Sequence, residues 1–208
     1  MTDSEISEIG SDSDSEENDT PSLQAGRRSS ASGHSDVNAN EEFYSEAEES
    51  LARAFLENHS VENATIELKT LRMATNVTFH EVREAIVSAL MNIVVTTPTK
   101  VRATFAKWGE LLLKFTEDED AEMDILFITQ RLFVKKVREG IAERKGFVIG
   151  LQALYQADIS EEERIFKWFE DKRSKGVGEK MGEEMAALRN AAEKFVTWLK
   201  EAEEESDE

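Results

Sequence analysis

The 208-residue sequence contains no cysteine, which excludes disulfide bonds and thiolate metal ligands. A chain without cysteine suits a reducing compartment, and we expect a cytoplasmic location. Histidine is scarce as well: His34, His59 and His80 lie far apart, and no two of them have the spacing of a metal-binding pair. We therefore expect no bound metal.

Long apolar runs are also missing. None reaches the roughly 18 residues that a membrane-spanning helix needs, and the chain opens on acidic and polar residues instead of a signal peptide. The sequence has no phosphate-binding G-x-x-x-x-G-K-[S/T] loop, no G-x-S-x-G motif and no carboxylate pair that supports hydrolysis. It therefore favours neither a membrane protein nor a hydrolase.

The sequence lacks the surplus of positive charge that a nucleic-acid binder needs, because its formal net charge is −19. Residues 1–40 carry −7 and residues 201–208 carry −6, which leaves −6 for the long middle part. This distribution argues against direct nucleic-acid binding. It favours a basic protein partner that is attracted through electrostatic steering.

Residues 1–40 contain Ser, Asp, Glu, Gly and Asn but almost no large apolar side chain. Such a segment cannot bury enough surface to offset the entropy lost on ordering. We therefore predict a disordered acidic linker over residues 1–40. A helical domain over 41–200 and an acidic tail over 201–208 would follow it.

Helical periodicity dominates the sequence from about residue 42 to residue 200, whereas strand-type alternation is hard to find. Residues 81–95 place their apolar side chains on one stripe, and residues 101–115 repeat the pattern. Short breaks with Gly, Pro, Asn, Asp or Ser separate the periodic segments. The sequence therefore predicts an all-α fold of about eight helices, each about 10–20 residues long.

The short connections predict antiparallel helix hairpins. Four stacked hairpins would form an α-solenoid of HEAT type, in which each pair buries its apolar face on the next. A closed bundle is the alternative, because no clean internal repeat marks the solenoid.

The stretch "IELKTLRMATNVTFHEV" (residues 66–82) holds two glutamates with different local settings. Glu81 completes a T-x-x-E capping box with Thr78, in which the Glu81 side chain reaches back to the Thr78 amide. Loss of such a cap costs about 1 kcal/mol. We therefore interpret Glu81 as a helix cap, and His80 as a surface residue of the same first turn.

Glu67 has no such explanation, because it lies inside the predicted helix 63–75. The outer side of this helix carries few charges. Its uncharged residues are Ile66, Thr70, Met73 and Ala74. One interpretation is that neighbouring helices bury both sides of it. The other is an exposed partner-binding surface whose single charge is Glu67.

Two C-terminal segments, "EERIFKWFEDK" (162–172) and "AEKFVTWLKEAEEESDE" (192–208), each set a tryptophan before acidic residues. The aromatic residues can simply close the last hairpin of the core. Alternatively, the carboxylates attract lysine ammonium groups while the indole covers the lysine stems. Because each exposed pair is worth about 0–1 kcal/mol, such binding would be multivalent and salt-sensitive.

Paired aromatic–acidic boxes at the end of a helical domain resemble the two-tryptophan HEAT domain shared by several translation initiation factors. Together, "IELKTLRMATNVTFHEVREAI" and "WLKEAEEES" resemble most the epsilon-subunit family of eukaryotic initiation factor 2B, over roughly residues 42–208. The resemblance implies guanine-nucleotide exchange on initiation factor 2, in which GDP is released so that GTP can bind. Because exchange is not covalent chemistry, no cofactor is expected.

The family's exchange-critical acid, the glutamate of its E-L-N-x-L-R helix, falls on Glu67, and the apolar residue before it falls on Ile66. Lys69 stands at the asparagine position, so the motif is incomplete. The resemblance implies that the GTPase gamma subunit faces this side of the helix, around the Ile66, Thr70, Met73 and Ala74 surface.

The boxes match the family's binding surface for the lysine-rich part of the beta subunit. The residues implied are Trp168, Glu170, Asp171, Trp198, Glu201, Glu203, Glu204 and Glu205. The family's strand-rich N-terminal domains, which would contact other subunits of initiation factor 2B, are absent from this sequence, and residues 1–40 would be the linker to them.

Two alternatives to exchange stay open at this point. The chain could be a non-catalytic binding module resembling the C-terminal domain of initiation factor 5, which carries the boxes without exchange activity. It could also be an unrelated acidic helical scaffold for basic proteins.

Overall fold

The computed structural model describes residues 32–178 and 180–206, with side chains from residue 39 to residue 202 except residue 179. The first 31 residues of the expected linker therefore lie outside the described residues. The helices are α1 (Ser32–Glu57), α2 (Val61–Thr75), α3 (Phe79–Thr96), α4 (Val101–Leu113), α5 (Glu119–Arg138), α6 (Arg144–Gln156), α7 (Glu162–Glu170), α8 (Gly182–Ala191) and α9 (Glu193–Ser206), with a 3-10 turn η1 (Pro98–Lys100) before α4. The described part contains no strand, so the prediction of an all-α fold is confirmed. None of these helices is long and apolar enough to cross a membrane.

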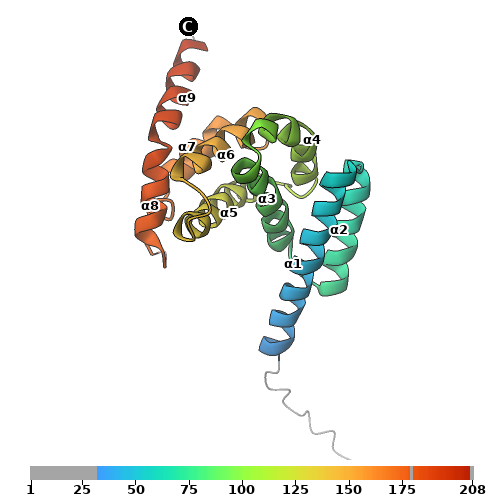
Figure 1. Ribbon diagram of the computed structural model, residues 1–208. Helices are drawn as coiled ribbons and strands as arrows, with labels where there is room; N and C mark the ends of the chain where they lie inside the picture. Colours follow the sequence, from blue (N-terminus) through green and yellow to red (C-terminus); the bar gives the residue numbers. More distant parts are fainter. Residues whose placement is uncertain (1–31, 179, 207–208) are drawn as a thin grey trace, which may run out of the picture. The chain divides into compact units, whose positions relative to one another are not determined.

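The helices stack as antiparallel pairs (Figure 1). The hairpins α1–α2, α3–α4 and α5–α6 follow one another, so that α1 packs on α3 and α3 packs on α5. In the second layer α2 packs on α4 and α4 packs on α6. This two-layer order is compatible with the predicted HEAT-like solenoid, in which each pair covers the apolar face of its neighbour.

The C-terminal pair departs from the prediction. Residues 183–200, expected as one helix, form α8 and α9, which meet at Ala192. The backbone of Ala192 stays helical, with φ −82° and ψ −8°, and its amide donates to the carbonyl oxygens of Leu188 and Arg189. The break between α8 and α9 is therefore a single residue, without an intervening loop.

Two helices also extend beyond the domain limits of residues 41 and 200 that the sequence predicts. Helix α1 begins at Ser32, within the segment expected to be a linker. Helix α9 continues to Ser206, into the expected tail. Because Glu and Ala are good helix formers, residues 201–205 can prolong α9 without a core to pack against.

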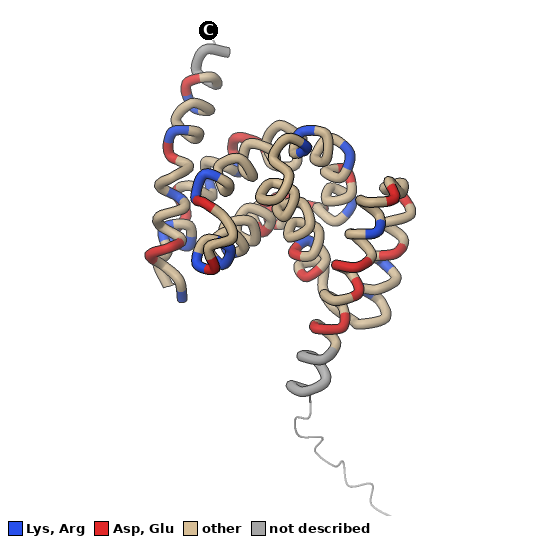
Figure 2. The backbone as a smooth tube through the Cα atoms, in the orientation of Figure 1, with Lys and Arg blue, Asp and Glu red and all other residues tan. Residues whose placement is uncertain are grey.

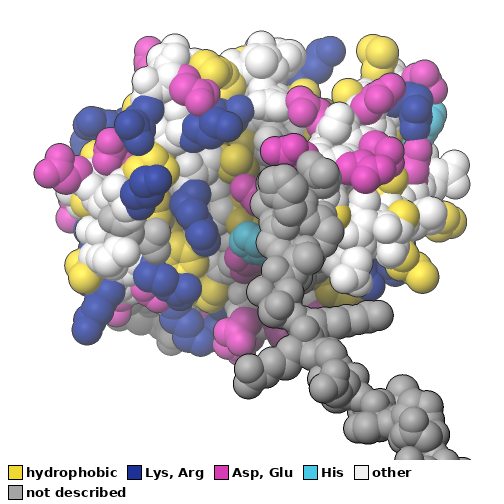
Figure 3. All heavy atoms as spheres, turned by 90° about the horizontal axis from the view of Figure 1, so that it is seen from below, with side chains coloured by type: hydrophobic (Ala, Val, Ile, Leu, Met, Phe, Trp, Pro, Cys, Tyr) yellow, Lys and Arg dark blue, Asp and Glu magenta, His cyan; other side chains and the backbone are white. Residues whose placement is uncertain are grey.

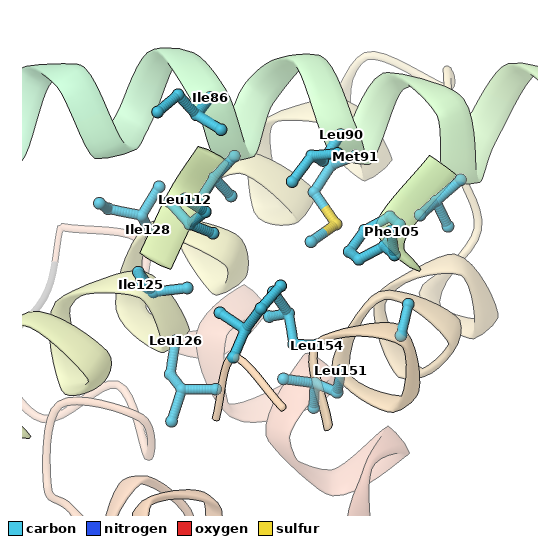
Figure 4. Close-up of a cluster of buried hydrophobic side chains, with 14 of the residues drawn as sticks. Ile86, Leu90, Met91, Phe105, Leu112, Ile125, Leu126, Ile128, Leu151 and Leu154 are labelled. Atoms are coloured by element: carbon cyan, nitrogen blue, oxygen red, sulfur yellow. The ribbon is translucent and has the colours of Figure 1, made fainter. Parts of the chain in front are cut away.

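Side chains from α3, α4, α5 and α6 fill the centre of the stack (Figure 4). Leu90, Leu112, Leu126 and Leu154 point into this space and are fully buried. Helix α6 approaches α3 at Gly150, where an added Cβ would lie 2.9 Å from the sulfur of Met91. Glycine at this position therefore allows the close contact between the second and third pairs.

A buried glutamine joins the last helices to this core. The side chain of Gln130, on α5, is completely buried, and its Oε1 accepts a hydrogen bond from the indole Nε1 of Trp168 at 3.0 Å. Its Nε2 donates to the carbonyl oxygens of Ser174 at 3.0 Å and Met185 at 2.8 Å. One amide therefore connects α5 to α7, to the loop after α7 and to α8.

A second polar cluster holds α3 against α5. The carboxylate of Asp124 lies 2.9 Å from Nδ1 of His80 and accepts hydrogen bonds from Arg83 Nε at 3.0 Å and Nη2 at 2.8 Å. Burial alone would raise the pKa of Asp124, but the bonds from His80 and Arg83 lower it. The hydrogen bond to Asp124 raises the pKa of His80, and the charges of Glu84 and Glu81 act in the same direction. His80 is thus an interhelical contact as well as a first-turn residue.

We expect Gln130→Met to lower the free energy of unfolding by at least about 2 kcal/mol, because it removes three hydrogen bonds while nearly keeping the side-chain volume. Urea unfolding followed by circular dichroism measures the change. Gln156→Ala, at an exposed position of α6, is the matched control and should change stability little. Equal stability of the wild type and Gln130→Met would contradict the linking role of this amide.

We expect the His80–Asp124 contact to make stability depend on pH. Because the pKa of His80 is raised in the folded state, its stabilisation is complete below the unfolded value of about 6.5 and is lost as pH rises through the folded-state pKa. Asp124 stays ionised over this range, because its own pKa is lowered. His80→Asn and Asp124→Asn should each flatten the unfolding free energy between pH 6 and pH 8, whereas an unchanged slope in His80→Asn would refute the contribution.

Candidate functional site

The outer face of α2 is exposed. Ile66 is 65% exposed and Met73 is 75% exposed, and Thr70 and Ala74 also face solvent. The opposite side of α2 buries Val61, Ala64, Thr65 and Leu68. The interpretation in which neighbours bury both sides of this helix is therefore excluded for the described part of the chain. An open, weakly charged surface remains.

Glu67 stands at the edge of this surface with its carboxylate held by an ion pair. Its Oε1 lies 2.5 Å from Nη2 of Arg53, on α1, and the two side chains are 36% and 45% exposed. Arg53 is not among the site residues that the sequence predicts. The available signal was that α1 contains this single Lys or Arg in an otherwise acidic helix.

The residue that departs from the family motif, Lys69, does not direct its charge toward Glu67. Lys69, at the asparagine position, directs its ammonium toward the ring of Phe115, 6.0 Å from the ring centroid. The amine therefore lies over the neighbouring helical pair and not over Glu67. Arg72, the last residue of the motif, stacks on Phe79 at 4.4 Å and donates to the carbonyl oxygen of Val77.

The turn between α2 and α3 is fixed by caps at both helix ends. Ser60 caps the start of α2 through a bond from the amide of Asn63, and Asn76 ends the helix with φ 58°. Thr78 and Glu81 form the predicted capping box at the start of α3. Burial would raise the pKa of Glu81, but hydrogen bonds from the hydroxyl and amide of Thr78 lower it. Glu81 is confirmed as a cap, so of the two glutamates in this stretch only Glu67 lies beside the open surface.

The first C-terminal box is largely structural. Trp168 is fully buried against Phe147, with ring centroids 5.7 Å apart, so its indole offers no face to a ligand. Asp171 accepts hydrogen bonds from the backbone and guanidinium of Arg173, and these bonds lower the pKa of Asp171. The expectation that the indole of Trp168 contacts a partner is corrected, because this position belongs to the core face of α7.

The second box and the end of the first remain open to solvent. Trp198 is 54% exposed, and Glu170 and Glu201 are exposed too. Lys200 joins the boxes, since its Nζ lies 3.6 Å from Oε1 of Glu170 while α9 passes α7. Glu203, Glu204 and Glu205 belong to α9, but their side chains lie outside those described.

The helical domain carries opposite charge in its two halves. Residues 41–130 contain 17 acids and eight Lys or Arg, whereas residues 131–200 contain 12 acids and 15 Lys or Arg. Figure 2 shows the acids concentrated along α1 and α2, and Figure 3 shows Lys and Arg gathered on the side of α5 to α8. The strongly negative total therefore hides a C-terminal half, residues 131–200, in which bases outnumber acids.

Among the described residues, no group of three or more His, Asp or Glu is arranged to hold a metal ion. The candidate sites are therefore two surfaces. One is the outer face of α2 with Glu67, and the other is the rim where α9 passes α7.

Comparison with known proteins relates this arrangement to a family. Residues 121–208 match the W2 domain described as eIF4-gamma/eIF5/eIF2-epsilon. The chain is 38% identical over 213 residues to translation initiation factor eIF2B subunit epsilon of Schizosaccharomyces pombe. This similarity covers 100% of the chain and 30% of that relative, so the chain spans under a third of the relative's length. Residues 121–208 are therefore similar to the W2 domain of translation initiation factors, and the whole chain is similar to a part of eIF2B subunit epsilon.

Proposed function

We propose that the chain is a guanine-nucleotide exchange domain that acts on the GTPase subunit of translation initiation factor 2. The observation that carries the proposal is Glu67, an acid held by Arg53 at the edge of the exposed helix face that carries Ile66 and Met73. Ile66 and Met73 supply apolar area for a protein contact, and apolar patches of this kind mark interaction sites.

An exchange factor must bind the nucleotide-free GTPase more tightly than the GDP-bound form, because only that difference shifts the population. A carboxylate contributes if it competes with the nucleotide phosphates for a cationic side chain, or if it disturbs the magnesium shell. The ion pair with Arg53 favours the first route, because it already holds Glu67 in a geometry that accepts a cation.

The acidic rim would provide the second contact of the complex. Glu170 and Glu201 lie near the crossing of α7 and α9, and the acids that follow in α9 continue the same charge. We propose that this rim docks the lysine-rich segment of the beta subunit of the same factor. The docking would tether the substrate while the α2 surface acts on the GTPase.

The alternative is a non-catalytic binding module, and one observation favours it. The W2 match begins at residue 121, so it includes α5 to α9 but not α2 or Glu67. The similarity to eIF2B subunit epsilon, by contrast, covers the whole chain, α2 included. Release of GDP from initiation factor 2 in the presence of this chain separates the two functions.

We expect Glu67→Ala to abolish the acceleration of GDP release and to leave the fold intact. The ion pair with Arg53 is exposed, so its loss should lower the free energy of unfolding by no more than about 1 kcal/mol. Release of labelled GDP from initiation factor 2 measures the rate, and urea unfolding measures stability.

Glu62→Ala is the matched control, because Glu62 is an exposed acid in the first turn of the same helix. This variant should accelerate release as the wild type does. A wild-type rate of GDP release in the presence of Glu67→Ala would contradict the role proposed for Glu67. No acceleration by the wild-type chain would favour the binding-module alternative.

We expect Glu170→Lys/Glu201→Lys to weaken binding of a lysine-rich peptide by roughly tenfold and to flatten its dependence on salt, because attractive pairs become repulsive. Fluorescence anisotropy at a series of salt concentrations measures both quantities. Glu110→Lys/Glu117→Lys makes the same change in net charge at exposed acids elsewhere. Equal effects of the two double variants would show general attraction instead of a docking site.

A further inference from the structure

A groove runs between α6 and α9 beside the acidic rim. Its volume is about 690 Å³. Helix α6 contributes Lys145, Val148 and Gln152, and α9 contributes Lys194, Phe195 and Trp198.

The floor of this groove is a fixed aromatic surface. Trp198 is 54% exposed, whereas Trp108 is 4% exposed and Trp168 is fully buried. The indole of Trp198 stacks on the buried ring of Phe195, with centroids 6.1 Å apart and planes 19° apart. Tyr155 also contacts Phe195, in an edge arrangement with ring centroids 6.2 Å apart. The exposed indole is therefore supported in one orientation, as anchor residues of interfaces commonly are.

The charged side chains that line the groove are all positive. Lys145 and Lys194 line it, and no acid does. Several other bases of this half are paired, for example Lys167 with Glu119 and Lys200 with Glu170. Within the described residues, by contrast, no ion pair involves Lys145 or Lys194. Two uncompensated ammonium groups therefore stand beside an exposed indole.

We propose that this groove binds an acidic segment of a partner protein that also carries an aromatic or aliphatic side chain. Its carboxylates would pair with Lys145 and Lys194, and its apolar side chain would cover Trp198. A lysine-rich segment does not fit, because the two lysines repel it. The assignment goes beyond the proposed function, since it gives the α6 side of Trp198 a ligand of opposite charge to that of the rim.

The chain offers a direct probe of this site, because it contains three tryptophans and only Trp198 is exposed. The full chain labelled with 5-fluorotryptophan gives one fluorine resonance for each indole, and Trp198→Phe assigns the resonance of interest. The ligand is a synthetic peptide of glutamates interrupted by phenylalanines. We expect it to shift the Trp198 resonance, to leave those of Trp108 and Trp168 in place, and to lose affinity as salt increases.

Charge reversal tests the two lysines. Lys145→Glu/Lys194→Glu should weaken the peptide by at least about tenfold, the loss expected for two charge pairs turned repulsive. Lys100→Glu/Arg102→Glu makes the same change in net charge at exposed bases near α4 and should bind as the wild type does.

Three outcomes would overturn the proposal. One is a Trp198 resonance that moves with a lysine–phenylalanine peptide and not with the acidic one. A second is equal weakening by both double variants, which would show general attraction to the basic half. The third is equal affinity for a peptide of glutamates alone, since the indole would then contribute nothing.

Discussion

The hydrogen bonds of Gln130 organise the C-terminal half of the molecule. Its buried amide satisfies the indole of Trp168 and two carbonyl oxygens from the segments that follow, so none of these groups is left unpaired in the core. The arrangement sets α7 and α8 on α5, and α9 follows directly from α8. The exposure of Trp198 and the position of the acidic rim therefore depend on one side chain four helices earlier in the chain.

The two candidate surfaces follow the same construction at opposite ends of the helix stack. Each is the outer side of a helix whose inner side is well buried, and each exposes at least one large apolar side chain near charged residues. The α2 face combines Ile66 and Met73 with Glu67 at its edge, whereas the α9 face changes from Lys194 through Trp198 to Glu201 within two turns. Because surface charges act over about a Debye length of 8–10 Å, neighbouring sites of opposite sign can select different ligands.

The sequence predicted what depends on local order. Helical periodicity predicted the helices and the all-α class, and the T-x-x-E spacing predicted the cap by Glu81. Pairing between helices could not be predicted, because Arg53 and Gln130 reach their partners only through tertiary packing. The boxes show the same limit: Trp168 and Trp198 have similar neighbours in sequence, yet the first lies on a core face and the second at its edge. Composition alone treats them as equivalent.

The weakness of the Arg53–Glu67 pair fits a working acid better than a structural one. An exposed pair contributes about 0–1 kcal/mol, so the cost of exchanging Arg53 for a cation of a partner is small. A buried pair would resist this exchange, because separating it leaves an uncompensated charge in a poorly solvated site. The Asp124 cluster has that more enclosed character, and it joins α3 to α5. Glu67 instead stands at the open edge of α2, where its partner can change while the backbone of the hairpin stays in place.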